Sequence, residues 1–148
     1  DNWFHYEGFY NIPLDDFMRV FHHALDNEFS VVFAADVSEK LFQQKTGYAM
    51  LDGDLDGIDV VTPEQREEMW DRWQTTDDHG MHAVGIVKDD DGLIYYIVKN
   101  SWGTDPNRTG PYNGHIYVHE NYMRGKLEAY MMHKDAVPAD ILEKLGIK

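Results

Sequence analysis

Residues 77–103 read DDHGMHAVGIVKDDDGLIYYIVKNSWG, and this stretch decides the expected fold. Two runs rich in aliphatic and aromatic residues, 81–87 and 94–98, flank an acidic turn, 89–92, that ends in Asp-Gly. Asp-Gly between two such runs is a recognised β-hairpin signal. The sequence therefore predicts an antiparallel hairpin, with a histidine where the first strand begins and an asparagine just past the end of the second.

An amphipathic helix and a buried strand are expected before the hairpin. Apolar residues recur at helical spacing after Pro13, at positions 17, 20, 21, 24 and 25, with two aspartates in the first turn. This spacing predicts a helix with one buried face. Residues 29–35 form a short β-branched and aromatic run, which indicates a buried strand, and the polar turn 36–40 follows it.

A second helix is expected in the middle of the chain, after the glycine- and aspartate-rich loop 47–61. In Thr62-Pro63-Glu64-Gln65 the threonine can cap the helix, the proline suits its first position and the glutamine completes a capping box. The helix is predicted to run to Trp73. Its spacing predicts burial of Met69, Trp70 and Trp73.

The C-terminal part is predicted to contain further strands and a short closing helix. Strands are expected at 115–119 and 127–133, after the loop 103–114, and a helix at 139–145 should end at Gly146. Residues 1–10 are interpreted as an irregular lead-in. We find no linker and no internal repeat, so we expect one domain, residues 1–148, of the α+β class with its antiparallel strands mainly in the second half.

Composition places the chain among acidic soluble domains and excludes several kinds of function. It has 148 residues, a net charge of −14, 43% hydrophobic residues and no cysteine. The negative charge opposes binding to nucleic acid and to anionic membrane surfaces, and no apolar run is long enough to span a bilayer. Without cysteine, the chain itself carries no disulfide and no thiol nucleophile. We therefore predict no nucleic-acid or membrane partner, and no cofactor or metal.

The hairpin is expected to bring a histidine and an asparagine together at one end. His79 opens the first strand and Asn100 follows the second. Such a pair suits catalysis by a cysteine, because the imidazole can take the thiol proton while the amide oxygen fixes the other ring nitrogen and its tautomer. His82 competes for this role, but it points to the opposite face of the strand, so only one of the two histidines can meet Asn100. A histidine at a strand start that merely bonds a backbone carbonyl is the simpler interpretation.

Two motifs resemble those of the papain-like cysteine peptidases. His79 is followed six positions later by a glycine, and Lys99-Asn100-Ser101-Trp102-Gly103 follows an aromatic-rich strand. In that family the histidine opens such a strand and the asparagine lies in an Asn-Ser-Trp-Gly motif. Within the family, residues 36–40, 76–81 and 133–138 are most similar to the bleomycin hydrolase and aminopeptidase C branch. The resemblance extends from about residue 10 to the end of the chain.

The resemblance implies a fold and a role for individual residues. The chain would be the β-rich C-terminal half of a papain-like fold, with helices flanking its antiparallel strands. His79 would be the general base and acid, Asn100 its orienting partner, and Trp102 the indole that shields their hydrogen bond from water. The terminal carboxylate of Lys148 would meet the free amino group of a peptide substrate, which would make the enzyme an aminopeptidase.

The same resemblance implies a missing partner. Papain-like enzymes carry the nucleophilic cysteine and the glutamine of the oxyanion hole in a preceding helical half, and neither motif is present here. The expected partner is therefore the cysteine-bearing half of the same protein, and the chain alone is expected to be inactive. A homo-oligomer and a cytoplasmic location are also in keeping with the resemblance.

Two other functions are consistent with the sequence. The chain could be a catalytically inactive papain-like module that binds a partner where the cysteine half would lie. It could also bind calcium through Asp52, Asp54 and Asp56, which alternate as in an EF-hand loop, although the twelfth position is Pro63 instead of glutamate. Zinc is not expected at His115 and His119, because their Cβ atoms would be about 13 Å apart. The pair His22-His23 is predicted to lie on the surface of the first helix.

Overall fold

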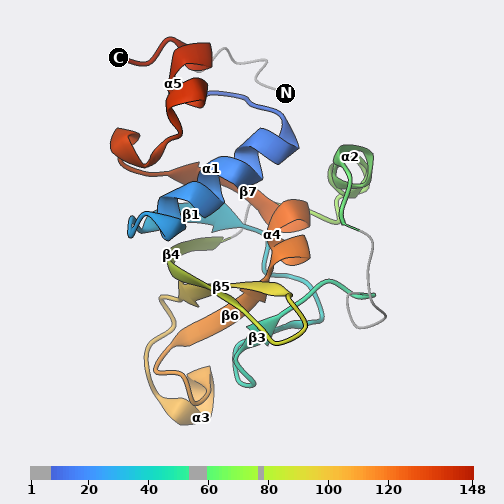
Figure 1. Ribbon diagram of the computed structural model, residues 1–148. Helices are drawn as coiled ribbons and strands as arrows, with labels where there is room; N and C mark the ends of the chain where they lie inside the picture. The colour runs from blue at the N-terminus through green and yellow to red at the C-terminus, as the bar shows by residue number, and fades with distance from the viewer. Residues whose placement is uncertain (1–7, 54–59, 77–78) are drawn as a thin grey trace.

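The described part of the chain forms one seven-stranded sheet. A computed structural model describes residues 8–53, 60–76 and 79–148 (Figure 1). The strands are β1 (Val31–Ala35), β2 (Phe42–Gln43), β3 (Tyr48–Ala49), β4 (His79–Lys88), β5 (Ile94–Lys99), β6 (His115–His119) and β7 (Leu127–Met131). Their order across the sheet is β2-β3-β6-β5-β4-β1-β7. Neighbouring strands are antiparallel except β3 and β6, which run parallel.

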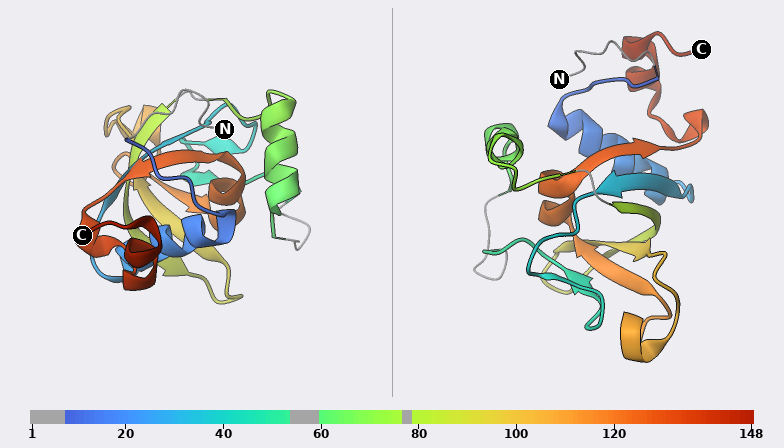
Figure 2. Two further views of the ribbon diagram at one scale, coloured as in Figure 1. Left: turned by 90° about the horizontal axis from the view of Figure 1, so that it is seen from above. Right: turned by 180° about the vertical axis from the view of Figure 1, so that it is seen from behind.

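The helices lie around this sheet. They are α1 (Leu14–Asp26), α2 (Pro63–Asp71), α3 (Pro106–Thr109), α4 (Glu120–Lys126) and α5 (Ala139–Leu145), with a 3₁₀ turn at Lys134–Ala136. Helix α1 crosses one face of the sheet and contacts β4 and β1 (Figure 1). Helix α2 stands to one side of the sheet, and α5 lies beyond α1 near the C-terminus (Figure 2). Among the described residues, no helix is both long and apolar enough to cross a membrane.

The core lies between α1 and the sheet, as the helical spacing of apolar residues predicts. Val20, Phe21 and Ala24 are almost completely buried. The ring of Phe21 meets Phe33 of β1 and Tyr96 of β5 edge-on, with centroids 5.9 and 5.1 Å apart. Edge-to-face contacts of this kind add to the stabilisation that comes from burying apolar area. This packing fixes the position of the β4–β5 hairpin under α1.

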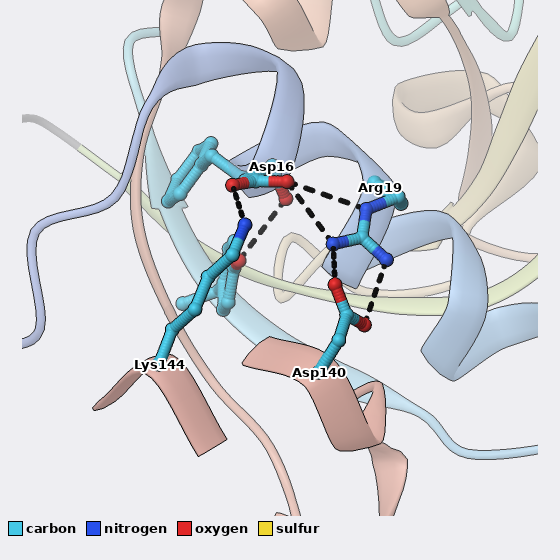
Figure 3. A network of polar contacts seen from close by, with 6 residues as sticks. Asp16, Arg19, Asp140 and Lys144 are labelled. Atoms are coloured by element: carbon cyan, nitrogen blue, oxygen red, sulfur yellow. Dashed lines mark hydrogen bonds and ion pairs between the residues drawn. The ribbon is translucent and has the colours of Figure 1, made fainter. Parts of the chain in front are cut away.

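A group of charged side chains holds α5 against α1. Arg19 of α1 donates hydrogen bonds to both carboxylate oxygens of Asp140 at 3.0 and 2.7 Å, and to Asp16 one turn earlier (Figure 3). Lys144 of α5 reaches Asp16 at 3.3 Å. The hydrogen bonds from Arg19 lower the pKa of both carboxyl groups. We call these four residues the α1–α5 clamp.

Helix α2 departs from the sequence prediction at its C-terminal end. The capping box is confirmed, because the side chain of Thr62 accepts from the backbone of Gln65 while the side chain of Gln65 accepts from the backbone of Thr62. The helix ends at Asp71, however, and Trp73 has a left-handed φ of 58° and is 83% exposed. Trp70 is also exposed, and Met69 is half-buried. The predicted burial of the two tryptophans is wrong, because α2 stands beside the sheet and packs against the core and α4 through Met69, while both indoles remain exposed.

Other boundaries and one helix also differ from the expectation. The strand expected at 29–35 begins at Val31, and the one expected at 127–133 ends at Met131. The expected loops 47–61 and 103–114 contain β3 and α3. Helix α4 was not predicted, and the expected lead-in 1–10 lies largely outside the described residues. His22 is not simply a surface residue, because its Nε2 contacts the hydroxyl of buried Tyr96 and lies 3.2 Å from Glu120.

Candidate active site

The β4–β5 hairpin brings His79 and Asn100 together. In the ladder His82 lies opposite Lys99, so the start of β4 and the residue after β5 are at the same end of the hairpin. There, Nε2 of His79 lies 2.7 Å from Oδ1 of Asn100. The sequence predicted this meeting, and it rests on the register of two adjacent strands.

The carboxamide of Asn100 is buried and bonded on both sides. Its side chain is almost inaccessible, at 5% exposure. Oδ1 also accepts a hydrogen bond from the backbone of Ser101 at 2.7 Å, and Nδ2 donates to Oε1 of Gln44 at 2.9 Å. The backbone of Asn100 donates to the carbonyl of Gly114 at 3.1 Å. The oxygen of the amide therefore faces His79, and the nitrogen faces away.

This orientation determines which nitrogen of His79 can act as a base. An amide oxygen only accepts hydrogen bonds, so Nε2 of His79 carries the proton and donates it. In the neutral ring the lone pair then lies on Nδ1. Among the described residues, Nδ1 has no hydrogen-bond partner. The imidazole is thus half-buried, oriented from one side and available on the other, as a general base requires.

Trp102 lies against the imidazole. The two ring centroids are 5.2 Å apart with an interplanar angle of 40°, and Phe42 meets the indole edge-on at 5.9 Å. Trp102 is 43% exposed, so it is not an ordinary core tryptophan. The indole therefore lies beside His79, and the shielding role that the resemblance implies stays a prediction.

The remaining predicted site residues do not join this pair. His82, the alternative base that the sequence disfavoured, pairs in the ladders with Val32 and Lys99, and no hydrogen bond joins it to Asn100 among the described residues. Lys148 accepts a hydrogen bond on its main-chain oxygen from Lys134 at 3.1 Å. No hydrogen bond or ion pair in the described parts of the chain connects Lys148 to His79, so its predicted role stays a prediction.

A buried carboxylate next to the start of β4 was not singled out as a functional group from the sequence. Asp36 follows Ala35, which lies opposite His79 in the β1–β4 ladder, and Asp36 is fully buried. One of its oxygens accepts from the backbone and hydroxyl of Ser38, both at 2.7 Å, and the other from the backbone of Thr76 at 2.8 Å. Burial alone would raise the pKa of Asp36, but these hydrogen bonds and the charge of Lys126 lower it. The carboxylate is therefore ionised and holds the segment that leads toward His79.

Lys126 reinforces this segment from α4. Its side chain is 1% exposed, its ammonium lies 2.6 Å from the carboxylate of Glu39, and it donates to the carbonyl of Gln74. A buried ammonium is stable only when it is paired and hydrogen-bonded, and both conditions are met here. Asp36 and Lys126 together fix residues 74–76. In the sequence, the Asp-Val-Ser turn was the feature that could have indicated this arrangement. Beyond that turn, however, the groups that Asp36 and Lys126 bind lie far away along the chain.

The predicted metal sites gain no support. Asp54 and Asp56 of the candidate calcium loop lie outside the described residues, and Asp52 is exposed. Within the described ranges, no three His, Asp or Glu side chains are grouped closely enough to hold a metal ion.

Comparisons with known proteins identify the family. The model of the Peptidase C1-like family matches residues 5–147. PepW from Lactobacillus rhamnosis HN001 has a similar structure, with a TM-score of 0.65 and 22% sequence identity over 93% of this chain and 31% of PepW. A bromelain protease from Ananas comosus, solved with the E64 inhibitor, matches with a TM-score of 0.38 and 21% identity over 67% of this chain and 34% of its own.

These matches also define how much of the fold the chain represents. No curated protein matches the chain. The likeness to PepW, together with the sheet and its flanking helices, confirms the predicted α+β fold of the papain-like type. The chain spans about a third of the length of the two solved structures. Because the family model covers nearly all of its residues, the chain belongs to the Peptidase C1-like family.

Proposed function

We propose that this chain supplies the histidine and asparagine of a cysteine peptidase whose nucleophilic sulfur comes from outside these 148 residues. The observation that carries the proposal is the 2.7 Å contact between Nε2 of His79 and Oδ1 of Asn100, which leaves Nδ1 as the free base. The 148 residues contain no cysteine, so the thiol must belong to another segment or another chain. Family membership supports a cysteine as the missing group.

The proposed reaction divides peptide hydrolysis into two steps. Nδ1 of His79 takes the thiol proton, and the thiolate attacks the carbonyl carbon of the scissile bond. The tetrahedral intermediate collapses when the same nitrogen returns a proton to the leaving amine, which gives a thioester and a free amine. Water, deprotonated by Nδ1, then attacks the thioester and releases the carboxylic acid and the thiol. Throughout, Asn100 stabilises the positive charge of the imidazolium through its amide oxygen.

We further propose the bleomycin hydrolase and aminopeptidase C branch, with an aminopeptidase activity. The support is the similarity of residues 36–40, 76–81 and 133–138 to that branch. A carboxylate at Lys148 can hold an ammonium at a fixed depth, so only the first peptide bond would reach the thiolate. The complete protein should then cleave an aminoacyl fluorophore and leave its N-acetylated analogue intact. Equal cleavage of both substrates would contradict the aminopeptidase assignment.

Two histidine substitutions test the catalytic assignment. In the complete protein, His79→Ala should reduce kcat by at least about a thousandfold, because it removes the base. His82→Ala, a matched change on the same strand, should leave kcat within about threefold. Release of a fluorophore from an aminoacyl substrate measures both, with circular dichroism as the folding control. The reverse ranking would assign the base to His82.

The absence of cysteine from the 148 residues also favours a second function, that of an inactive binding module. Alkylation by iodoacetamide separates the two. A cysteine activated by His79 should react rapidly at neutral pH in the complete protein, and the reaction should slow markedly in His79→Ala. A complete protein with no such cysteine would support the binding module.

A further inference from the structure

Gln44 lies directly behind Asn100 and connects it to a different part of the fold. Gln44 is 6% exposed and belongs to the turn between β2 and β3. Its Oε1 accepts from Nδ2 of Asn100 at 2.9 Å. Its Nε2 donates to the backbone carbonyl of Thr109 at 3.2 Å and to that of His115 at 3.4 Å.

These contacts fix the direction of every hydrogen bond in the series that runs from the two carbonyl groups through Gln44 and Asn100 to His79. A backbone carbonyl can only accept, so two carbonyls at Nε2 require Gln44 to present its amide nitrogen there and its oxygen to Asn100. The oxygen of Gln44 in turn requires the nitrogen of Asn100, which leaves the oxygen of Asn100 for His79. We propose that Gln44 is a positioning residue that sets the orientation of Asn100 and, through it, the position of the proton on His79.

The surroundings of Gln44 leave it little freedom. Gly110 has a φ of 77° and lies so close that a Cβ built on it would be 2.8 Å from the carbonyl oxygen of Gln44. Thr109, which accepts the hydrogen bond, is 2% exposed. The loop 103–114 therefore approaches the backbone of Gln44 closely, while the carbonyl groups of Thr109 in this loop and of His115 in β6 accept hydrogen bonds from its side chain.

The Ser101 backbone favours the same orientation of Asn100, but it cannot replace Gln44. Its N–H donates to Oδ1 of Asn100 at 2.7 Å. This group is the next residue in the chain and moves with Asn100, whereas Gln44 is 56 residues away. Without Gln44, the nitrogen of Asn100 would be buried with no acceptor, which favours rearrangement of the amide.

The first experiment measures the proton on His79 directly and needs no catalysis. In the full chain labelled with ¹⁵N-histidine, the Nε2 proton of His79 should appear as a resonance that exchanges slowly with water. Gln44→Met, which keeps the length but removes both hydrogen-bonding groups, should speed this exchange by about tenfold. The matched control is Gln43→Met, the same change at the preceding residue, whose side-chain oxygen lies near Thr46 and not near Asn100. It should leave the exchange rate unchanged.

A second variant keeps the test decisive if Gln44→Met does not fold. Gln44→Glu retains an oxygen for Asn100, but once ionised it has no proton to donate to the carbonyls of Thr109 and His115. Compared with the wild type at the same pH, exchange of the Nε2 proton should stay slow while the new carboxyl is protonated. It should become faster once the carboxylate forms, because the carbonyl oxygens of Thr109 and His115 repel it and displace it from Asn100. Wild-type exchange in a folded Gln44→Met, or an exchange rate in Gln44→Glu that equals the wild-type rate at every pH, would overturn the role of Gln44.

The second experiment rests on the proposed function and uses the complete protein. Gln44→Met should lower kcat by about tenfold and change KM by less than about twofold, because only the base is affected. An equal loss in Gln43→Met would overturn the specific role of Gln44. A wild-type protein without peptidase activity would overturn the proposed function alone, since the proton-exchange measurement still decides the role of Gln44.

Discussion

His79 has two neighbours that contact its imidazole ring in different ways. Asn100 contacts Nε2, while the indole of Trp102 lies beside the ring, with its plane tilted by 40° from that of the imidazole. The first contact sets where the proton is, and the second is proposed to limit the access of water to that contact. Because the two neighbours act differently, their removal should have different consequences.

Replacement of Trp102 tests the shielding role. Trp102→Ala should lower kcat by about tenfold, since water can then compete for the hydrogen bond between His79 and Asn100. The free energy of unfolding should fall by only about 1–2 kcal/mol, because the side chain is already 43% exposed. Enzyme kinetics and urea unfolding of the complete protein give both values. Tyr112→Ala is the control, because Tyr112 is 44% exposed in the same loop and contacts Tyr117 instead of His79. A similar loss of kcat in the control would contradict the role of Trp102.

Asp36 predicts how stability depends on pH. Its pKa is lower in the folded chain than its ordinary value of about 3.9, so its stabilising effect is present above that value and is lost as the pH falls through the folded pKa. Asp36→Asn should cost about 2–3 kcal/mol at pH 7, because its amide nitrogen would face the donors of either Ser38 or Thr76 in place of an accepting oxygen. Urea unfolding should show this difference shrinking below about pH 4. The exposed Asp90→Asn should change little at either pH, and a gap for Asp36→Asn that stays constant to pH 2.5 would refute the explanation.

At the scale of elements, the sequence predicts the helices and strands whose identifying residues lie within the element itself. Helix α1, the β4–β5 hairpin and helix α5 were all predicted, because apolar spacing, an Asp-Gly turn and a terminal glycine lie within each segment. The meeting of His79 and Asn100 was predictable for the same reason, since it follows from hairpin register. The end of α2 was not, because burial of Trp73 depended on a neighbour that the fold does not supply.

Helix α4 and Gln44 show why the rest could not be predicted. Helix α4 buries Asn121, Arg124 and Lys126, which an apolar pattern would place outside. Each is satisfied by a distant group: Asn121 accepts from the backbone of Val61, and Arg124 donates to the carbonyl of Val61 and pairs with Asp15 at 2.7 Å. The role proposed for Gln44 likewise depends on the carbonyl groups of Thr109 and His115, which are 65 and 71 residues away in the sequence. Hydrogen-bond partners this far apart in the chain cannot be predicted from a local sequence pattern.

The α1–α5 clamp makes a prediction about the C-terminal helix. Its four side chains are solvent-accessible, so Arg19→Gln should change the global Tm by less than about 2 °C. The amide protons of α5 should nevertheless exchange faster, because the helix loses its main polar attachment to α1. Hydrogen exchange measured residue by residue checks this, and added salt should reproduce the effect in the wild type. Unchanged exchange in α5 would show that apolar packing alone holds the helix.

At the scale of the whole molecule, the proposed function makes this chain one side of an active site. The chain spans about a third of the length of PepW, Nδ1 of His79 lies on the side of the ring away from Asn100, and the 148 residues contain no cysteine. The homo-oligomer expected from the resemblance remains a prediction.

The isolated chain should therefore be inactive. Pure protein of these 148 residues should release fluorophore from an aminoacyl substrate at least about a millionfold more slowly than the complete protein, because the nucleophile is absent. The assay is the same fluorescence measurement, with His79→Ala of the isolated chain as a blank. Release that exceeds this blank would show that a residue other than cysteine performs the attack.

The spacing of the site along the chain also bears on the order in which it forms. His79 and Asn100 are 21 residues apart and can meet as soon as the hairpin closes, whereas Gln44 reaches Asn100 across 56 residues. Contacts between distant residues form late, since a larger loop must first be ordered. In a nascent or partly unfolded polypeptide, His79 would thus lie beside Asn100 before Gln44 has set the orientation of the Asn100 amide. The position of the proton on the imidazole would then not yet be determined. Competence for proton transfer would arrive only with the finished tertiary structure.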